Sequence, residues 1–478
     1  MKSFYITTTL PYVNAEPHIG FALEIVTADV IARYHRLIGD KVVFNTGTDE
    51  HGQKIYQKAL DQSKTPKEYV DEYAQKFARL KKALNLSYTH FIRTTDKHHQ
   101  KAAQEFWRRC ATNGDIYKAR YKTKYCVGCE LEKTDSELVD GRCPLHPDKE
   151  LEIREEENYF FRLSKYQDKL LKLYQGNPEF VKPEKKLKEI KTFVEGGLKD
   201  FSISRLNSKM PWGVPVPNDN KHVMYVWFDA LVNYVSTLGW PEDKETFEKF
   251  WGTKEKPKAV QIAGKDNLRQ QAAMWQAMLM SANLPTSKQI LINGFISVGG
   301  QKMSKSLGNV ISPFEMVGRY GVDATRFLLL NLGPIGDDMD VSWERLDREY
   351  TAYLANGLGN LASRVAKLAS QTKAALQADI STFKPKISQA LDRFDVKTAL
   401  NEVKHQVEAG DKYLSETKPW LLESEERIKA IKPIINQVTQ IAYQLQPFMP
   451  EIAKKLLDHF GQKKIEPLKP LFPRVKER

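Results

Sequence analysis

The stretch that decides the fold is residues 4–46, FYITTTLPYVNAEPHIGFALEIVTADVIARYHRLIGDKVVFNT. Its β-branched start, Phe4–Thr9, predicts a strand, and a loop with two prolines leads into a predicted helix over residues 18–38. A second predicted strand, Lys41–Thr46, follows at once. Strand, helix and strand at this spacing indicate a parallel α/β sheet, whose ligands bind beyond the carboxyl ends of the strands. We therefore expect a site in the segments that follow these strands, near residues 10–20 and 47–52.

The α/β pattern is interrupted and then resumes along the chain. Cysteines, charged runs and short apolar pieces predict an insertion over residues 116–220. Buried-strand patterns return at Val223–Phe228, Ala259–Ala263 and Gln289–Ile292, whereas apolar residues recur at helical spacing after residue 350. The predicted fold class is therefore α/β, with a Rossmann-type parallel-sheet domain split by the insertion and followed by a C-terminal α-helical bundle. The predicted domains are residues 1–115 and 221–290 for the two halves of the parallel-sheet domain, 116–220 for the insertion, 291–350 for a linker and 351–478 for the bundle.

Length and composition restrict the class of protein. The chain has 478 residues, which at about 150 residues per domain allows about three cores, and 41% of the residues are hydrophobic, which excludes disorder as the main state. Lys and Arg number 73 against 60 Asp and Glu, so the net charge of +13 favours a polyanionic partner such as nucleic acid over a basic protein without one. No apolar run reaches the roughly 18 residues of a membrane span, and four cysteines make no disulfide framework. We therefore expect a cytoplasmic protein with no membrane partner.

Four residues with metal-binding side chains form two close pairs within the predicted insertion. Two residues separate Cys126 from Cys129, two separate Cys143 from His146, and thirteen lie between the pairs. This spacing is typical of tetrahedral structural zinc sites, and thiolates favour zinc over oxygen-preferring metals. The alternative is a pair of turns with free thiols. Four ligands leave no open position, which disfavours a zinc-dependent RNA hydrolase, and the remaining Cys110 is predicted to be buried and inert.

Two segments carry residues suited to bind phosphate. His18-Ile19-Gly20 begins the first predicted helix, whose N-terminal N–H groups attract anions, and the glycine lets a ligand approach the backbone. Farther along, Lys302-Met303-Ser304-Lys305-Ser306 stands between glycines, where two lysines can close over a triphosphate and stabilise developing charge. Each segment alone fits a simpler interpretation, a helix cap for His18 and a solvated basic loop for residues 302–306. Their presence together in one α/β chain favours binding of a nucleoside triphosphate.

These motifs together identify a family. The sequence closely resembles the methionyl-tRNA synthetases, a family of class I aminoacyl-tRNA synthetases, over essentially the whole chain. The resemblance rests on the Cys and His pairs and on the motifs Pro11–Ala15 with His18–Gly20, Gly47–Gly52, Tyr225–Ala230, Gly264–Asp266, Lys302–Ser306 and Asn360–Arg364. It implies a ligase that activates L-methionine with ATP to methionyl-adenylate and then transfers the methionyl group to the 3′ end of tRNA(Met). The implied cofactors are one structural Zn²⁺ and Mg²⁺ bound with ATP, and a monomer is expected because the chain ends with the bundle.

The resemblance also assigns residues to the site. The methionine carboxylate is already a nucleophile, so catalysis should rest on positioning and on charge stabilisation at the phosphates. The implied catalytic residues are His18, Lys302 and Lys305, and the implied ATP-binding residues are His18, Gly20, Phe21, Lys302, Ser304 and Lys305. The implied methionine-binding residues are Leu10, Tyr12, Trp227, Ala230, Leu231, Tyr234 and Gln271 around the side chain and Asp49 at the ammonium group. Without the resemblance, Trp227 and Tyr234 would be assigned to the core.

Two positions depart from the family pattern. Phe21 stands where the family carries a second histidine, so one hydrogen-bond donor to ATP is missing. Gln271 stands where the family often has a histidine that faces the methionine side chain. These departures leave an alternative open, a catalytically impaired paralogue that only binds tRNA, and methionine-dependent pyrophosphate exchange separates the two. The intact residues 302–306, Asp49 and Trp227 favour the active enzyme.

The resemblance implies anticodon contacts in the helical bundle. Asn360 and Arg364 lie four residues apart and so share one helix face, and Trp420 follows Pro419 near the start of another helix. Splayed bases of single-stranded RNA stack on aromatic rings and are read on their edges by Asn or Arg, which fits these residue types. The alternative places Trp420 in the core and gives Asn360 a role in helix packing.

Overall fold

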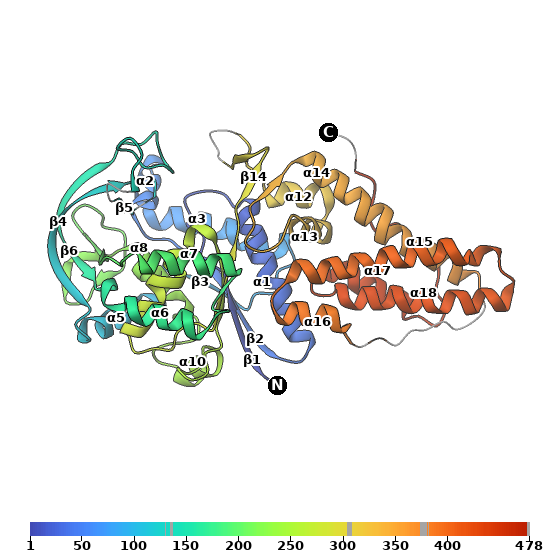
Figure 1. Ribbon diagram of the computed structural model, residues 1–478. Coiled ribbons are helices and arrows are strands. Elements are labelled where there is room, and N and C mark those ends of the chain that lie inside the picture. Colours follow the sequence, from blue (N-terminus) through green and yellow to red (C-terminus); the bar gives the residue numbers. More distant parts are fainter. Residues whose placement is uncertain (130, 134–136, 304–307, 373–379, 381, 476–478) are drawn as a thin grey trace.

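The computed structural model describes residues 1–129, 131–133, 137–303, 308–372, 380 and 382–475. The molecule is elongated, with an α/β part at one end and a helical part at the other (Figure 1). The long strands β4 (Ile116–Cys126) and β6 (Glu152–Phe161) are at one end, and the helices α17 (Val396–Thr417) and α18 (Ser424–Leu445) extend to the other. Within the described ranges, no helix is long and apolar enough to cross a membrane.

Six parallel strands form the main sheet, which confirms the predicted α/β class. The order across the sheet is β3-β2-β1-β12-β13-β7, and each neighbouring pair is parallel. Successive side chains of a strand point to opposite faces, so Phe4 and Ile6 pack into one core with the first helix, while Tyr5 packs into a second core. The strands of this sheet are β1 (Ser3–Thr7), β2 (Lys41–Thr48), β3 (His90–Arg93), β7 (Val181–Lys182), β12 (Val260–Gly264) and β13 (Gln289–Asn293).

The connections of the sheet determine where a ligand can bind. From β1 the chain continues to β2 and β3 on one side, whereas β12 and β13 lie on the other side. The strand order therefore reverses between β1 and β12. Open α/β sheets bind their ligands at such a point, in the crevice beyond the carboxyl ends of the two strands. Residues that follow Thr7 and Gly264 are thus placed at the predicted site.

Helix α1 (Ile19–Leu37) agrees with the helix predicted over residues 18–38. His18 is its N-cap, and the side chain accepts a hydrogen bond from the backbone N–H of Gly20. The helix is buried along most of its length because it packs on the sheet and also contacts α13 (Val322–Asn331) and α17. The other helices of the α/β part are α2 (Gln53–Asp61), α3 (Pro66–Ala78), α4 (Leu80–Ala83), α5 (Lys97–Thr112), α6 (Gln167–Gly176), α7 (Glu184–Glu195), α8 (Val226–Leu231), α9 (Asn233–Ser236), α10 (Lys244–Phe250) and α11 (Trp275–Ser281), with shorter turns η2 (Leu163–Tyr166), η3 (Lys265–Asn267) and η4 (Gln270–Met274).

The strand predicted at Val223–Phe228 is wrong in part. Strand β11 ends at Met224 in a small antiparallel sheet, and Val226 begins helix α8. The β-branched and aromatic residues favour a strand locally, but the Phe228 ring packs edge-to-face on Phe106 and Trp107 of α5, with centroids 6.0 and 5.2 Å away. Tertiary packing therefore overrides the local preference.

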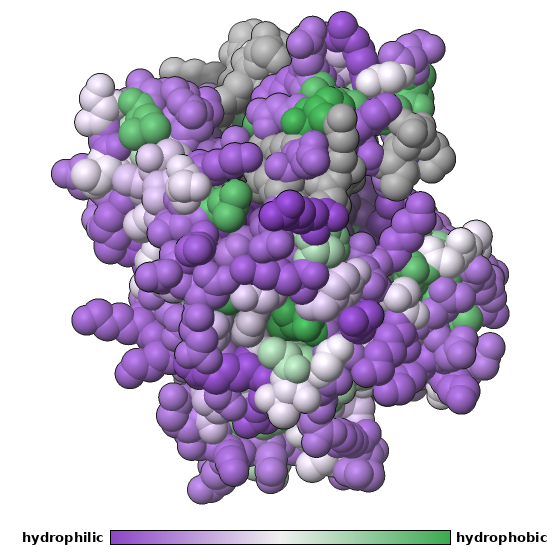
Figure 2. Space-filling model, turned by 90° about the vertical axis from the view of Figure 1, so that its left-hand side faces the viewer, coloured by the Kyte–Doolittle hydropathy of each residue, from purple (hydrophilic) through white to green (hydrophobic). Residues whose placement is uncertain are grey.

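The insertion contains two antiparallel sheets. One has the order β5-β4-β6-β8 and the other β10-β11-β9. The face of the molecule that carries the insertion is mostly polar, with apolar side chains only in small separate areas (Figure 2). Besides β4 and β6, the strands of these two sheets are β5 (Leu131–Lys133), β8 (Phe201–Ser202), β9 (Ser204–Leu206), β10 (Pro215–Val216) and β11 (Asp219–Met224).

Part of residues 116–220 belongs to the main sheet rather than to these antiparallel sheets. Strand β7 pairs with β13 at the edge of the parallel sheet, with Val181 opposite Ile290. Helices α6 and α7 flank this strand and contact each other. The boundaries of the five predicted segments stay predictions.

The linker and the bundle follow the α/β part. The linker combines a small sheet of order β15-β14-β16 with helices, and its first helix begins with a capping box of Ser312 and Glu315. The sequence predicts no strand after residue 350, and the regular elements among the described residues beyond it are all helices. The elements are β14 (Ile296–Val298), β15 (Gln301–Lys302), α12 (Pro313–Tyr320), β16 (Met339–Val341), α14 (Trp343–Glu349), η6 (Tyr350–Gly359), α15 (Asn360–Ser370), α16 (Pro385–Asp392), η7 (Pro419–Leu421) and α19 (Pro450–Phe460).

A buried ion pair joins the α/β part to the helical part. The guanidinium of Arg326 on α13 lies 2.8 Å from the carboxylate of Asp29 on α1, and both side chains are fully buried. Arg326 also donates hydrogen bonds to the backbone carbonyls of Leu84, Pro447 and Phe448 at 3.0, 2.9 and 2.8 Å. A buried guanidinium needs such partners, so this residue fixes the packing of the two parts.

Candidate functional site

A cavity of about 650 Å³ opens beyond the carboxyl ends of β1, β2, β12 and β13. Its position is the one predicted from the parallel sheet. Segments far apart in the sequence meet there, because parallel strands end at the same edge. The residues that line it include Leu10, Tyr12, His18, Gly20, Phe21, Glu24, Asp49, Lys54, Phe77, Cys129, Trp227, Asp266, Asn293 and Met303.

The start of helix α1 forms one wall of the cavity. The Nδ1 atom of His18 accepts the Gly20 N–H at 3.1 Å, so the neutral imidazole carries its proton on Nε2. The surrounding protein desolvates the charged form and lowers the pKa of His18, while Asp266 acts in the opposite direction. A Cβ atom at position 20 would lie 2.8 Å from Cε1 of this ring, so a larger residue would displace the imidazole. The Nε2–H of His18 and the positive end of the α1 dipole thus lie together at the cavity and are suited to an anion.

Phe21 lines the cavity one residue farther along the helix. Its ring packs edge-to-face on Phe77 of α3, with the centroids 5.7 Å apart. The position that offers a histidine in the family is therefore part of an apolar contact between two helices. Phe21 adds packing to this wall and no hydrogen-bond donor.

Asp49 is placed by backbone hydrogen bonds between the segments that follow β1 and β2. Its N–H donates to the carbonyl of Pro11 at 3.0 Å, and its carbonyl accepts the N–H of Val13 at 3.2 Å. Tyr12 lies between these two partners and lines the same cavity. The Asp49 side chain is only 7% exposed. A nearly buried carboxylate beside an aromatic ring is suited to bind an ammonium group.

The predicted methionine-binding residues divide into two layers. Leu10, Tyr12, Asp49 and Trp227 line the cavity, as far as the described residues define it. Behind them, the Nε2 atom of Gln271 donates to the hydroxyl of Tyr234 at 2.7 Å and its Oε1 accepts from Gln261 at 3.1 Å. Gln271 lies in η4, a π-helical turn of the kind often found at functional sites. Ala230 and Leu231 follow Trp227 on α8, and Leu231 is buried.

Glu24, Asn293 and Asp266 are among the cavity residues that the sequence did not assign to the site. The carboxyl of Glu24 on α1 is buried, and burial raises its pKa to about 8 although hydrogen bonds from Thr9 lower it. Asn293 ends β13, and its Nδ2 atom is buried with no hydrogen-bond partner among the described residues. Asp266 also lines the cavity; it ends the motif Gly264–Asp266, and the family resemblance assigned it no role. The position of Asn293 at the carboxyl end of a predicted strand was the available signal, and for Glu24 the signal was a carboxyl among the apolar residues that begin the predicted helix.

The structure describes only part of the segment Lys302–Ser306, whose two lysines are predicted to close over the triphosphate and which we term the lysine clamp. Met303 lines the cavity, and its methyl group would lie 3.8 Å from a Cβ atom at position 20. Lys302 ends strand β15, which pairs with β14. The side chain of Lys302 and all of Ser304 and Lys305 lie outside the described residues. Their roles stay predictions.

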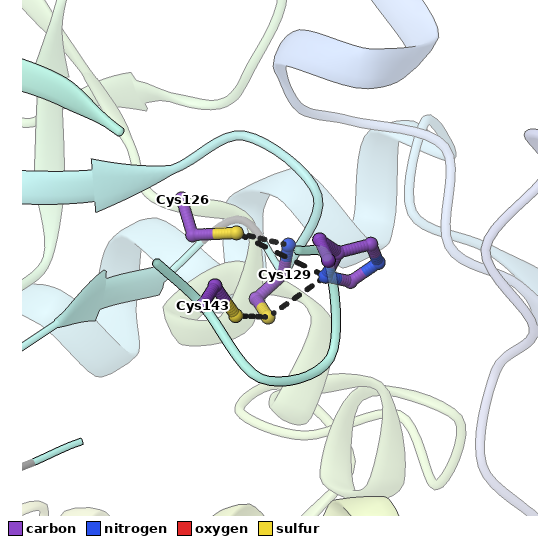
Figure 3. Close-up of side chains that lie close together, drawn as sticks. Cys126, Cys129 and Cys143 are labelled. Atoms are coloured by element: carbon purple, nitrogen blue, oxygen red, sulfur yellow. Dashed lines mark hydrogen bonds between the residues drawn. The ribbon is translucent and has the colours of Figure 1, made fainter. Parts of the chain in front are cut away.

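The two Cys and His pairs converge at the end of β4, as the spacing predicts (Figure 3). One ligand atom from each of Cys126, Cys129, Cys143 and His146 lies within 4.8 Å of all the others. The Cys129 sulfur is 3.4 Å from that of Cys143 and 3.2 Å from Nδ1 of His146. Tetrahedral zinc places such ligand atoms about 3.5–3.8 Å apart, so the group fits a metal ion. A Cβ atom at Gly128 would lie 2.3 Å from Cγ of His146, so the turn requires glycine.

This Cys and His group adjoins the cavity. Cys129 and Lys54 both line it, and the Lys54 ammonium donates to the backbone carbonyl of Gly128. Lys54 lies on α2, which follows the segment containing Asp49. The group therefore contributes Cys129 to the wall of the site. Cys110 is buried elsewhere, and burial raises the pKa of its thiol to about 12, as expected for an inert residue.

The predicted anticodon residues lie on the helical part. The Arg364 guanidinium is 5.7 Å from the ring centroid of Trp420 and 3.3 Å from the carboxylate of Asp411. The Trp420 side chain is 43% exposed, which contradicts the alternative that places it in the core. Asn360 is exposed at the first turn of α15, on the same helix as Arg364. An exposed indole beside a guanidinium is a surface on which a base can stack.

Comparison with known proteins agrees with this geometry. Residues 4–152 and 145–366 match the family described as tRNA synthetases class I (M), so the fold and the site define a class I aminoacyl-tRNA synthetase. Residues 365–469 match the anticodon binding domain of methionyl tRNA ligase. The chain belongs to the methionine–tRNA ligase family, and its function is that of a methionyl-tRNA synthetase.

Individual relatives match the chain over nearly its whole length. A methionine–tRNA ligase of Nostoc sp. is 41% identical over 96% of this chain and 90% of the relative. That of Thermotoga maritima is 40% identical over 95% of this chain and 74% of the relative. A solved structure of Mycobacterium tuberculosis methionyl-tRNA synthetase in complex with methionyl-adenylate superposes with a TM-score of 0.91 at 36% identity, covering 99% of this chain and 100% of that one.

Proposed function

We propose that this enzyme forms methionyl-adenylate in the cavity beyond β1 and β12 and then transfers the methionyl group to tRNA(Met). The observation that carries the assignment is the meeting of three groups in one cavity: the helix N-terminus at His18, the carboxylate of Asp49 and the indole of Trp227. A triphosphate, an ammonium group and an apolar side chain each find a complementary surface there. The methionyl-adenylate bound to the similar Mycobacterium tuberculosis structure supports this proposal.

Methionine is held at both ends in this proposal. Asp49 pairs with the ammonium group, while Leu10, Tyr12 and Trp227 pack against the thioether side chain. Ala230, Leu231, Tyr234 and Gln271 support that wall from behind. The carboxylate then points toward the α-phosphorus, and its attack releases pyrophosphate. Holding the reactants in line is the main contribution of the protein to this step.

ATP is bound by the start of α1 and by the lysine clamp. His18 donates its Nε2 hydrogen to a phosphate oxygen, and the positive end of the α1 dipole attracts the same anion. Lys302, Ser304 and Lys305 stabilise the charge that develops on the leaving pyrophosphate, and Mg²⁺ enters with the nucleotide. The Cys126, Cys129, Cys143 and His146 group holds a structural zinc ion that fixes the insertion beside the cavity.

The helical part recognises the anticodon. Trp420 offers a ring for stacking, and Arg364 and Asn360 read base edges beside it. The methionyl group then passes to the terminal adenosine of the tRNA. A cytoplasmic location and a monomeric enzyme stay predictions. The intact cavity favours this active enzyme over a paralogue that only binds tRNA.

Methionine-dependent ATP–pyrophosphate exchange tests the proposal. The wild-type chain and Phe21→His are compared side by side. We expect exchange with wild type and a faster rate with Phe21→His, because an imidazole adds a donor to phosphate and still packs on Phe77. A slower rate would mean that the phenylalanine is adapted to its neighbours, and no exchange with either chain would refute the assignment.

A further inference from the structure

Asp229 is a buried carboxylate held between two histidines from different elements. Its Oδ2 atom lies 2.8 Å from Nδ1 of His51, and its Oδ1 atom lies 3.2 Å from Nε2 of His99. The second nitrogen of His99 lies 3.0 Å from the hydroxyl of Ser236. The exposed fraction of each of these four side chains is 3% or less. The group is therefore a hydrogen-bonded chain sealed from solvent, which we term the Asp229 chain.

The contacts of the Asp229 chain fix which atoms carry protons. Burial raises the pKa of Asp229, but the two histidines outweigh this effect and hold it below its usual value. An ionised carboxylate can only accept, so His51 donates through Nδ1 and His99 donates through Nε2. The Ser236 hydroxyl beside Nδ1 of His99 also contacts the backbone carbonyl of Asn233, to which it donates at 3.4 Å. Both histidine links therefore point toward the Asp229 carboxylate, which accepts at each of its oxygens.

The Asp229 chain connects the two walls that grip methionine. Asp229 lies on α8, two residues after Trp227, and His51 lies two residues after Asp49. Since one carboxylate binds the segment that carries Asp49 to the helix that carries Trp227, it sets the distance between them. His99 reaches the same carboxylate from α5 and anchors both to the core.

A further aromatic contact holds the His51 side of this connection. The indole of Trp212 packs edge-to-face on the His51 ring with centroids 5.5 Å apart. Its Nε1–H donates to the backbone carbonyl of Glu50 at 2.6 Å. The segment from Asp49 to His51 is therefore fixed on one side by Trp212 and on the other by the Asp229 chain. A change in the hydrogen bonds of the Asp229 chain would therefore shift the position of Asp49.

We propose that Asp229 is a positioning residue for the methionine subsite and sets the spacing between Asp49 and Trp227 through His51. This inference rests on the proposed function. A buried carboxylate is costly to desolvate, and apolar packing of similar volume would often stabilise a core equally well or better. Its directional bonds fix geometry more tightly than apolar contacts do, and misplacement of a binding group by about 1 Å costs on the order of 100-fold in rate.

The test is the split between kinetic parameters in pyrophosphate exchange. Asp229→Asn keeps the size of the side chain but can accept through one atom only, so one histidine loses its acceptor. We expect at least a tenfold rise in KM for methionine and less than a twofold change in KM for ATP. His51→Leu should act in the same way. His51→Asn places an amide N–H near the position of Nδ1 and should recover most of the affinity that His51→Leu loses.

The matched control is Asp115→Asn. Asp115 is another buried carboxylate of the α/β part, and it accepts hydrogen bonds from Lys165, Tyr166 and Ser281 at 2.6, 2.5 and 2.8 Å. None of these four residues lines the cavity. This variant should lose stability without a rise in KM for methionine.

Four outcomes are distinguishable. An unchanged KM for methionine in folded Asp229→Asn and His51→Leu overturns the inference, as does an equal rise in both KM values. If Asp229→Asn does not fold, His51→Leu and His51→Asn decide the question alone. If the wild-type chain shows no methionine-dependent exchange, the proposed function fails and not the positioning role.

Discussion

The pH dependence of stability should reveal the protonation of Glu24. This carboxyl lies in the cavity wall and accepts hydrogen bonds from the backbone N–H and the hydroxyl of Thr9, at 2.7 and 2.6 Å. Burial nevertheless raises its pKa from 4.5 to about 8. The side chain is therefore neutral in the folded protein at pH 7 and ionised in the unfolded chain. At pH 7, folding of the protein is therefore coupled to the uptake of one proton by Glu24.

The contribution of Glu24 to the free energy of unfolding follows from its pKa values in the unfolded and folded states. Below pH 4.5 the carboxyl is protonated in both states, so its contribution to stability is fully present. Between pH 4.5 and about 8 the folded state binds more protons, so the free energy of unfolding falls as pH rises. Each tenfold difference in proton affinity corresponds to about 1.4 kcal/mol, so the full interval is worth about 5 kcal/mol as an upper bound.

Glu24→Gln removes the titration and keeps the acceptor. Its amide oxygen can receive both hydrogen bonds from Thr9 and has no charge to desolvate. Urea unfolding followed by tryptophan fluorescence is measured for both chains between pH 5 and 8.5. We expect similar stability near pH 5 and a variant that is more stable than wild type by about 3–5 kcal/mol at pH 8.5.

An exposed carboxylate provides the control for Glu24→Gln. The ammonium groups of Lys64 and Lys76 hold the pKa of Glu72 at about 2, so this group is ionised throughout the range. Glu72→Gln should therefore follow the wild-type pH dependence. Parallel curves for wild type and Glu24→Gln would refute the assignment of a neutral buried carboxyl.

Three further predictions concern the rest of the molecule. Arg326→Met leaves three buried carbonyls without their donor and removes one of the two guanidinium partners of Asp29, which keeps Arg33 at 2.7 Å. It should lower the free energy of unfolding by about 3–5 kcal/mol in a urea titration, since each buried acceptor left unpaired costs about 1–3 kcal/mol, and a loss below about 1 kcal/mol would contradict the role of Arg326 in joining the two parts. Removal of metal with a chelator should make three thiols reactive toward a thiol reagent while Cys110 stays protected; unchanged reactivity would argue against a bound metal. Trp420→Ala should weaken tRNA(Met) binding by about 1–3 kcal/mol in a filter-binding titration, with pyrophosphate exchange as the internal reference, and unchanged binding would exclude stacking on this ring.

Much of the architecture follows from local sequence patterns. The alternation of Phe4–Thr9, a helix and Lys41–Thr46 predicts the parallel sheet because apolar runs of this length fit strands buried on both faces. The spacing of Cys126, Cys129, Cys143 and His146 predicts their convergence, since two short turns bring each pair together without help from distant residues. These features depend on neighbours in the chain, so the sequence alone contains them.

Other features depend on partners that are distant in the sequence. Residues 225–228 favour a strand locally, yet the aromatic rings of α5 hold Phe228 in a helix. Phe21 was predicted as a missing donor, but only the structure shows that it packs on Phe77 from another helix. Glu24 attracted no prediction because its proton affinity is set by burial beneath Thr9 and not by its neighbours in α1.

The sequence by itself determined the fold class, the family, the metal-binding group and the residues that follow each strand of the sheet. Those features follow from local periodicity, from short spacings between residues and from sequence motifs. The tertiary structure decided which of the predicted residues line the cavity, which ones support it from behind, and how a carboxylate on α8 is tied to the segment after β2. Such arrangements arise where segments hundreds of residues apart exclude water together, and burial and distance exist only once the chain has folded.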